Sequence, residues 1–133
     1  MGKFVISRTK NNGFKFNLVA SNGEVIATSE VYTQKPKCKV GIASVVKNCG
    51  AEVENQTVEG YAVLPRPKYE VYKDKAGEFR FRLIASNGRI IAVGEGYKAI
   101  ASCINGINSI KKNAPDAQIE DNSLLRKTPE KQE

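Results

Sequence analysis

The sequence FKFNLVASNG at residues 14–23 recurs as FRFRLIASNG at residues 79–88, and this pair decides the fold of the chain. The correspondence extends without a gap from residues 3–51 to residues 68–116. Self-similarity at a fixed period is typical of a repeat architecture. The sequence therefore predicts two copies of one structural unit.

Each copy is predicted to form three strands, one helix and a fourth strand. Phe14, Phe16 and Leu18 alternate with other residues in the period-two pattern of a half-buried strand. An Asn-Gly pair follows in each copy, which between apolar runs predicts a hairpin with a type I′ turn, where both central residues have positive φ. The other strands are predicted around residues 4–6, 24–28 and 52–54, and around residues 69–71, 89–93 and 118–120.

The apolar spacing lengthens to three or four residues after the third strand, which predicts a helix in each copy. Its apolar positions are Cys38, Ile42, Val45 and Cys49 in the first copy and Cys103, Ile107, Ile110 and Ala114 in the second. Thr33 is predicted to cap the first helix, with Pro36 in its first turn. Gly41 and Gly106 lie mid-helix, where glycine costs about 1 kcal/mol relative to alanine, so their recurrence predicts close packing of helix on strand.

A unit of about 50 residues buries too little surface to be stable alone, so the two copies are expected to share one core. The predicted fold class is α+β, with both helices on one face of a mainly antiparallel sheet and the other face in water. The predicted boundaries are repeat one at residues 1–56, a linker at 57–67, repeat two at 68–122 and a flexible tail at 123–133.

Three motifs occur in both copies: F-x-F-x-L-x-A-x-N-G, A-x-x-E-x-Y and C-x-x-G-I-x-S-[VI]-x-K-N. In this combination they resemble the YegP-like family, a set of small, mostly bacterial proteins of unknown function. The resemblance implies two β(3)-α-β units that merge into one sheet with their C-terminal strands exchanged. It implies no activity and no catalytic residues. Because a tandem repeat can exchange strands within one chain, a monomer is expected.

The composition excludes several kinds of chemistry. The 133 residues contain no histidine, which removes an imidazole base, a Ser-His or Cys-His pair and His-containing metal sites. The three cysteines form no C-x-x-C motif, so neither a disulfide framework nor a zinc ribbon is expected. Cys38 and Cys103 are interpreted as small buried hydrophobes. We expect a cytoplasmic protein without a membrane span, metal or cofactor.

A first set of candidate functional residues lies on the strands, on the face opposite Phe14, Phe16 and Leu18. This candidate binding face comprises Lys15, Asn17, Tyr72, Arg80 and Arg82. Cations beside a tyrosine can bind phosphates and stack a base, but they also keep a wet sheet face soluble. The net charge of +7 is spread along the chain, which favours the second interpretation.

The second set is a repeated polar pair, Glu30 with Tyr32 and Glu95 with Tyr97, where the third strand leads to the helix. A duplicated carboxylate can act as an acid or base, or bind a cation. Alternatively, the glutamate caps backbone groups or is stabilised by the positive helix N-terminus, and the tyrosine packs at the sheet edge. The second alternative is favoured, because no other carboxylate is suitably spaced to pair with these glutamates.

The leading hypothesis is a non-enzymatic module without a cofactor that binds a partner through the exposed sheet face or the sheet edges. The partner is expected to be another protein first and an anionic polymer second. One alternative is weak, salt-sensitive binding of nucleic acid through Lys15, Arg80 and Arg82. The other alternative is an enzyme that uses the duplicated Glu and Tyr positions.

Overall fold

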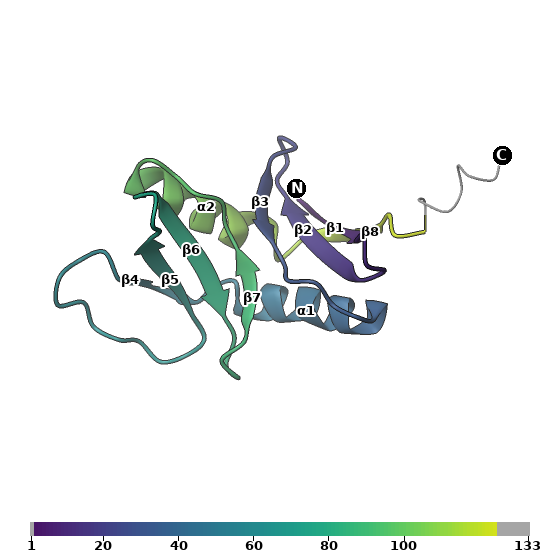
Figure 1. Cartoon of the computed structure of the whole chain (residues 1–133), viewed down its shortest axis with the longest axis horizontal. Helices are drawn as coiled ribbons and strands as arrows, with labels where there is room; N and C mark the ends of the chain where they lie inside the picture. The colour runs from purple at the N-terminus through teal and green to yellow at the C-terminus, as the bar shows by residue number, and fades with distance from the viewer. Residues whose placement is uncertain (1, 125–133) are drawn as a thin grey trace.

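The computed structural model describes residues 2–124, which form eight strands and two helices (Figure 1). Repeat one contains β1 (Lys3–Arg8), β2 (Phe14–Val19), β3 (Val25–Thr28), α1 (Lys35–Asn48) and β4 (Glu52–Asn55). Repeat two contains β5 (Lys68–Lys73), β6 (Phe79–Ile84), β7 (Ile90–Val93), α2 (Ile100–Asn113) and β8 (Gln118–Asp121). The predicted order of three strands, a helix and a fourth strand is confirmed in both copies.

All eight strands belong to one sheet in the order β4-β5-β6-β7-β3-β2-β1-β8. Neighbouring strands are antiparallel except at the two edges, where β4 pairs with β5 and β8 pairs with β1 in parallel. The fourth strand of each repeat therefore pairs with the first strand of the other repeat, as the family resemblance implied. The two halves meet at the centre of the sheet through one bridge pair, Thr28 with Val93.

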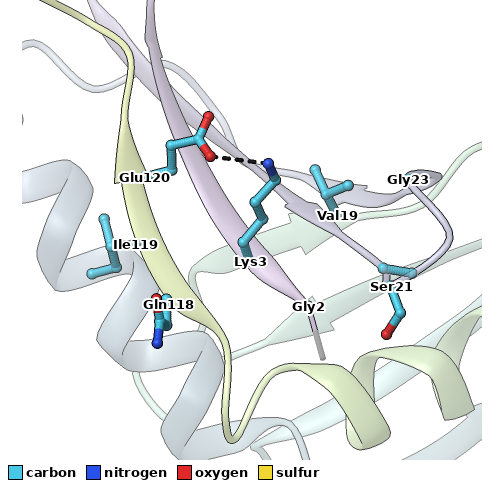
Figure 2. Close-up of a pocket in the computed structure, with 9 residues that line it drawn as sticks. Gly2, Lys3, Val19, Ser21, Gly23, Gln118, Ile119 and Glu120 are labelled. Atoms are coloured by element: carbon cyan, nitrogen blue, oxygen red, sulfur yellow. Dashed lines mark hydrogen bonds and ion pairs between the residues drawn. The ribbon is translucent and has the colours of Figure 1, made fainter.

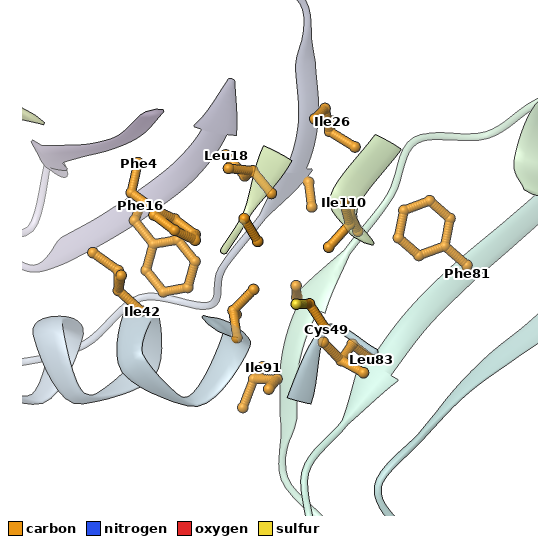
Figure 3. Packing of buried hydrophobic residues seen from close by; sticks show 14 of the residues in the cluster. Phe4, Phe16, Leu18, Ile26, Ile42, Cys49, Phe81, Leu83, Ile91 and Ile110 are labelled. Atoms are coloured by element: carbon orange, nitrogen blue, oxygen red, sulfur yellow. The ribbon is translucent and has the colours of Figure 1, made fainter. Parts of the chain in front are cut away.

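The core lies between the helices and one face of the sheet (Figure 3). Helix α1 packs on β2 and β7, and α2 packs on β6 and β3, so each helix contacts both repeats. Phe4 meets Phe16 edge-on with 5.7 Å between ring centroids, and Tyr69 meets Phe81 in the same way at 6.3 Å. The apolar helix positions predicted from the spacing are all buried.

The two mid-helix glycines make room for tyrosine side chains. The hydroxyl of Tyr32 lies against Gly41, and that of Tyr97 lies against Gly106. A Cβ atom on Gly106 would lie 2.7 Å from Tyr97 Oη and 3.1 Å from the Phe81 ring. The predicted close packing is confirmed, and the aromatic side chains are what the helix approaches.

We expect Gly106→Ala to lower the free energy of unfolding by up to about 2 kcal/mol. Crowding of Tyr97 costs about 1–3 kcal/mol, while the gain in helix propensity is only about 1 kcal/mol. Removing the hydroxyl with Tyr97→Phe in the same chain should recover most of the loss. Urea unfolding of the wild type, both single variants and the double variant tests this. An alanine effect that is the same with and without the hydroxyl would contradict it.

The hairpin turns differ from the predicted type I′. Gly23 and Gly88 each have a φ of 89°, but the asparagines before them are not in the positive-φ region. Gly23 N–H donates to Ala20 O at 2.9 Å, and Ala20 N–H donates to Glu24 O at 2.8 Å. This is the longer hairpin connection in which only the residue after the turn, here glycine, needs positive φ. The Asn22 side chain accepts a hydrogen bond from Glu24 N–H at 3.0 Å, which stabilises the turn without a left-handed asparagine.

The start of α1 also differs from the prediction, because Gln34 and not Thr33 is the N-cap residue. The helix begins at Lys35, with Pro36 in its first turn as predicted. Proline lacks a backbone N–H, so one of the donors that a capping side chain would serve is already missing at this end.

The outer face, meaning the face of the sheet opposite the helices, is covered over one half, although the sequence predicted it to be in water. Glu54, Lys68 and Glu70 lie on this face and have exposed fractions of 2%, 6% and 9%. The linker covers them, and its Leu64 N–H donates to a Glu54 carboxylate oxygen at 2.7 Å. The prediction failed because it treated residues 57–67 only as a connector.

The predicted flexible tail lies mostly outside the described residues. Its first residue, Ser123, is fully buried, and its N–H donates to the Asp121 carboxylate at 2.9 Å. Lys35 of α1 lies 2.8 Å from the same carboxylate. The end of β8 is thus tied to the helix of the other repeat.

Candidate functional site

The outer face carries side chains from all eight strands, aligned by the strand pairing. One row crosses the whole sheet through Glu120, Val5, Asn17, Thr28, Val93, Arg82, Glu70 and Glu54. The structure groups Tyr72, Arg80 and Arg82 on β5 and β6, and it places Lys15 and Asn17 on β2. The five residues of the candidate binding face therefore lie on one face but in two separate halves.

The two arginines of the candidate binding face are engaged by acidic side chains. Arg80 Nε lies 2.6 Å from Asp74, and Arg82 Nε lies 2.8 Å from Glu70. The Arg82 guanidinium also lies 4.5 Å from the centre of the Tyr72 ring. The hydrogen bond from Arg80 lowers the pKa of the Asp74 carboxyl. A phosphate ligand would have to compete with these carboxylates for the same cations.

Lys68 is the centre of a buried ion network beneath the linker. Its Nζ lies 2.7 Å from Glu54 and 3.3 Å from Glu70. Glu54 also accepts hydrogen bonds from Gln56 Nε2 and Leu64 N–H, each at 2.7 Å. This network was not predicted from the sequence. Its only signal there is the opposite charge of residues at alternating positions of β4 and β5, and these two strands become neighbours only when the fourth strands are exchanged between the repeats.

The network predicts a specific dependence of stability on pH. Burial alone would raise the pKa of Glu54, but hydrogen bonds from Lys68, Gln56 and Leu64 outweigh it and lower the pKa to about 2. Because the folded pKa is below the unfolded one, the stabilisation is present above pH ~4.5 and is lost as the pH falls towards 2. Urea unfolding from pH 7 to pH 2 should show the wild type losing its advantage over Glu54→Gln in that window. A difference that stays constant with pH would contradict this.

The repeat-one half contains the same ion pair without a cover. Lys3 and Glu120 occupy the positions of Lys68 and Glu54, with Lys3 Nζ 2.9 Å from Glu120 (Figure 2). Their side chains are 48% and 44% exposed, against 8% and 1% in the covered pair. Together with Gly2, Val19 and the hairpin around Ser21 and Gly23, they line a groove of about 430 Å³. We call this the Lys3–Glu120 groove.

The repeated polar pairs lie on the helix side, where the two members of each pair point into different surroundings. Glu30 is exposed and lies 3.6 Å from Arg89 of the other repeat. Tyr32 stacks on Phe16 with 6.5 Å between ring centroids, and burial raises its pKa. Glu30, Tyr32 and Arg89 also line a second groove of about 430 Å³ beside α1. Glu95 is exposed as well, while Tyr97 packs against the core.

The cysteines are buried thiols. Cys38, Cys49 and Cys103 are free, and burial raises the pKa of Cys38 and Cys103 to about 11. The thiols of Cys38 and Cys103 are therefore protonated at neutral pH.

Residues 2–124 contain no group of three or more His, Cys, Asp or Glu side chains arranged to hold a metal ion. Over the same described range, neither helix has the length and apolar character needed to cross a membrane.

Comparison with known proteins identifies the repeat unit. Residues 9–55 and 74–121 each match the model of a domain of unknown function, DUF1508. The chain belongs to this family. The UPF0339 protein YegP of Escherichia coli is 36% identical over 122 residues, which cover 92% of this chain and 98% of that protein. A UPF0339 protein of Treponema denticola is 60% identical over 52 residues, which are 39% of this chain but 90% of that protein.

Two solved structures of similar proteins share the architecture. The solution NMR structure of the UPF0339 protein SO3888 from Shewanella oneidensis is 34% identical, with a TM-score of 0.76 over 92% of each chain. The solution NMR structure of yegP from E. coli is 35% identical, with the same TM-score over 92% of this chain and 93% of that one. The predicted family and the predicted α+β fold are confirmed. The DUF1508 family brings no function with it.

Proposed function

We propose that the protein is a non-enzymatic module that binds another protein through the open half of the outer face, over β1, β2 and β3. The asymmetry of the repeated sheet supports this proposal most. Beside β5 the linker contacts the outer face where the Glu54–Lys68 pair is buried, whereas among residues 2–124 no segment covers the matching Lys3–Glu120 pair. In one half of the sheet this surface is buried against the chain's own linker. The equivalent surface in the other half is therefore suited to be buried against another protein.

The side chains of the open half also favour a protein partner. Val19 and Val25 face each other across β2 and β3, and Val25 is 39% exposed. Asn17 and Thr28 form the next cross-strand pair, and their side chains are hydrogen-bonded at 2.9 Å. Charged residues are depleted at the centre of a protein interface, and these four side chains are all uncharged. Nucleic acid is the less favoured partner, because Arg80 and Arg82 are already ion-paired.

We expect Val25→Glu to weaken capture of the partner by about tenfold or more, since an unpaired carboxylate buried in an interface costs more than about 1.4 kcal/mol. The same change at Val40, which is 69% exposed on α1, is the matched control and should leave binding unchanged. The full chain and both variants are used to capture proteins from lysate of the source cells at low and high salt. The circular dichroism of each variant is compared with that of the wild type beforehand.

The proposal requires a captured protein that stays bound at high salt. Its capture must be lost with Val25→Glu but not with Val40→Glu. Equal capture by both variants would contradict it. An eluate that consists of nucleic acid and disappears at high salt would instead favour the nucleic-acid alternative. The enzyme alternative has less support, because Glu30 and Glu95 are both exposed to solvent.

A further inference from the structure

We propose that the Lys3–Glu120 groove binds an extended peptide segment of a partner protein, in the same way that linker residues Leu64, Pro65 and Arg66 occupy the matching site in the other half. This inference rests on the proposed function and specifies the ligand of the open face. The partner segment is expected to carry a large apolar residue followed by proline and arginine.

The two sites are equivalent in their hydrogen bonds as well as in their topology. In each half, the residue after the edge strand donates its N–H to the neighbouring strand at 2.8 Å and its side-chain amide to the edge glutamate. These residues are Gln56, which bonds Val71 and Glu54, and Asn122, which bonds Ile6 and Glu120. The same edge glutamate then pairs with the lysine that begins the adjacent strand. A ligand geometry observed in one half can therefore be transferred to the other.

In the covered half, the linker contacts the outer face at two points, and an apolar side chain on that face is buried. Leu64 N–H donates to Glu54, and the Glu54–Lys68 pair is buried beneath the linker. Ile84, on the outer face of β6, is only 8% exposed. The Arg66 guanidinium lies so close to the Gly88 turn that a Cβ atom on Gly88 would collide with it. The linker thus places a backbone hydrogen bond on Glu54 and a cation over the glycine of the hairpin, and the apolar Ile84 is buried on the same face.

Each of these contacts has an unfilled counterpart in the Lys3–Glu120 groove. Within residues 2–124, Glu120 accepts two hydrogen bonds, from Lys3 and Asn122, where Glu54 accepts three. The missing bond is the one from the linker backbone, and a carboxylate can accept about four. Val19 replaces Ile84 and lines the groove. In the described part of the chain, the space over Gly23 that corresponds to the Arg66 position is open.

The linker indicates an arginine in the ligand, because its Arg66 side chain lies over the Gly88 turn, which is equivalent to the Gly23 turn. A proline before the arginine keeps the segment extended and lowers the entropy cost of binding.

The probe is a synthetic peptide with the sequence of residues 60–68, GYAVLPRPK, titrated into the ¹⁵N-labelled full chain. We expect saturable chemical-shift changes at Lys3, Val19, Gly23 and Glu120. The matching site should not respond, because the linker is tethered there at a high effective concentration. Glu120→Gln should weaken binding about tenfold, and so should a peptide with glutamate in place of its arginine. Glu95→Gln, at an exposed glutamate outside the groove, is the matched control.

Three results would overturn the proposal. The first is the absence of saturable shifts, or shifts outside the groove. The second is a dependence of the groove resonances on protein concentration without peptide, which would mean that a second copy fills the groove. The third is a change in these resonances on Arg126→Glu without peptide, which would assign the groove to the chain's own C-terminal residues. If the peptide fails while capture still depends on Val25, the open face keeps its proposed function and only this ligand is rejected.

Discussion

Lys68→Met is expected to lower the free energy of unfolding by about 3 kcal/mol, the larger effect of two identical substitutions at equivalent positions. Removing Lys68 leaves Glu54 without its lysine at a site where its side chain is 1% exposed. Breaking one partner out of a buried ion pair is strongly destabilising, because the remaining charge is no longer compensated. Urea unfolding at pH 7, followed by far-ultraviolet circular dichroism, measures the change.

Lys3→Met is the matched control, and it should cost less than about 1 kcal/mol. The Lys3–Glu120 pair has nearly the same length but is almost half exposed, so water and salt screen it. Adding Glu54→Gln to Lys68→Met should recover part of the loss, since the amide needs no counter-charge. Equal losses of unfolding free energy for Lys68→Met and Lys3→Met would contradict the inference that burial beneath the linker makes the Lys68 pair the more important one.

Dividing the chain between Gly60 and Tyr61 is expected to abolish monomeric folding of both fragments. Each fragment ends in a strand, β4 or β8, whose partner strand lies in the other fragment. Each helix also loses the strand of the other repeat on which it packs. The loss amounts to most of the roughly 5–15 kcal/mol by which a domain of this kind is stable.

An equimolar mixture of the two fragments should regain the circular dichroism spectrum and the cooperative unfolding transition of the intact chain. Light scattering should show a one-to-one complex for the mixture and a monomer for the intact chain. A fragment that folds cooperatively as a monomer would contradict the dependence of each repeat on the exchanged strand. A stable dimer of the intact chain would contradict the expectation that exchange within one chain is sufficient.

The elements and the core could be predicted from the sequence because both depend on local periodicity. Phe16 and Phe81 alternate with polar neighbours, and their recurrence in both copies separates the pattern from chance. Gly41 and Gly106 indicated a close approach for the same reason, since an unfavourable residue that recurs in a helix needs a packing explanation. The candidate binding face was predicted to share one side of the sheet, and the alternation of β2 and β6 places it there.

Whether the charged side chains of that face are paired could not be predicted, because the pairing depends on contacts between residues that are distant in the sequence. The period-two pattern places Arg80 and Arg82 on the outer face but gives no sign that Asp74 and Glu70 hold them. The same pattern cannot show which edge strand lies beside β5, so the Glu54–Lys68–Glu70 network was missed. The turn at Asn22 was wrongly assigned because the Asn-Gly pair fits two hairpin geometries, and strand register selects between them.

The sequence by itself determined that the protein is a tandem repeat, where its strands and helices lie, and which side chains form the core. Only the tertiary structure decided which of two equivalent ion pairs is buried. Lys3 and Lys68 begin equivalent strands with similar local sequences, yet one pair is open and the other is covered. The physical reason is that the copies repeat but the connection between them occurs once. The linker can therefore close only one of the two sites.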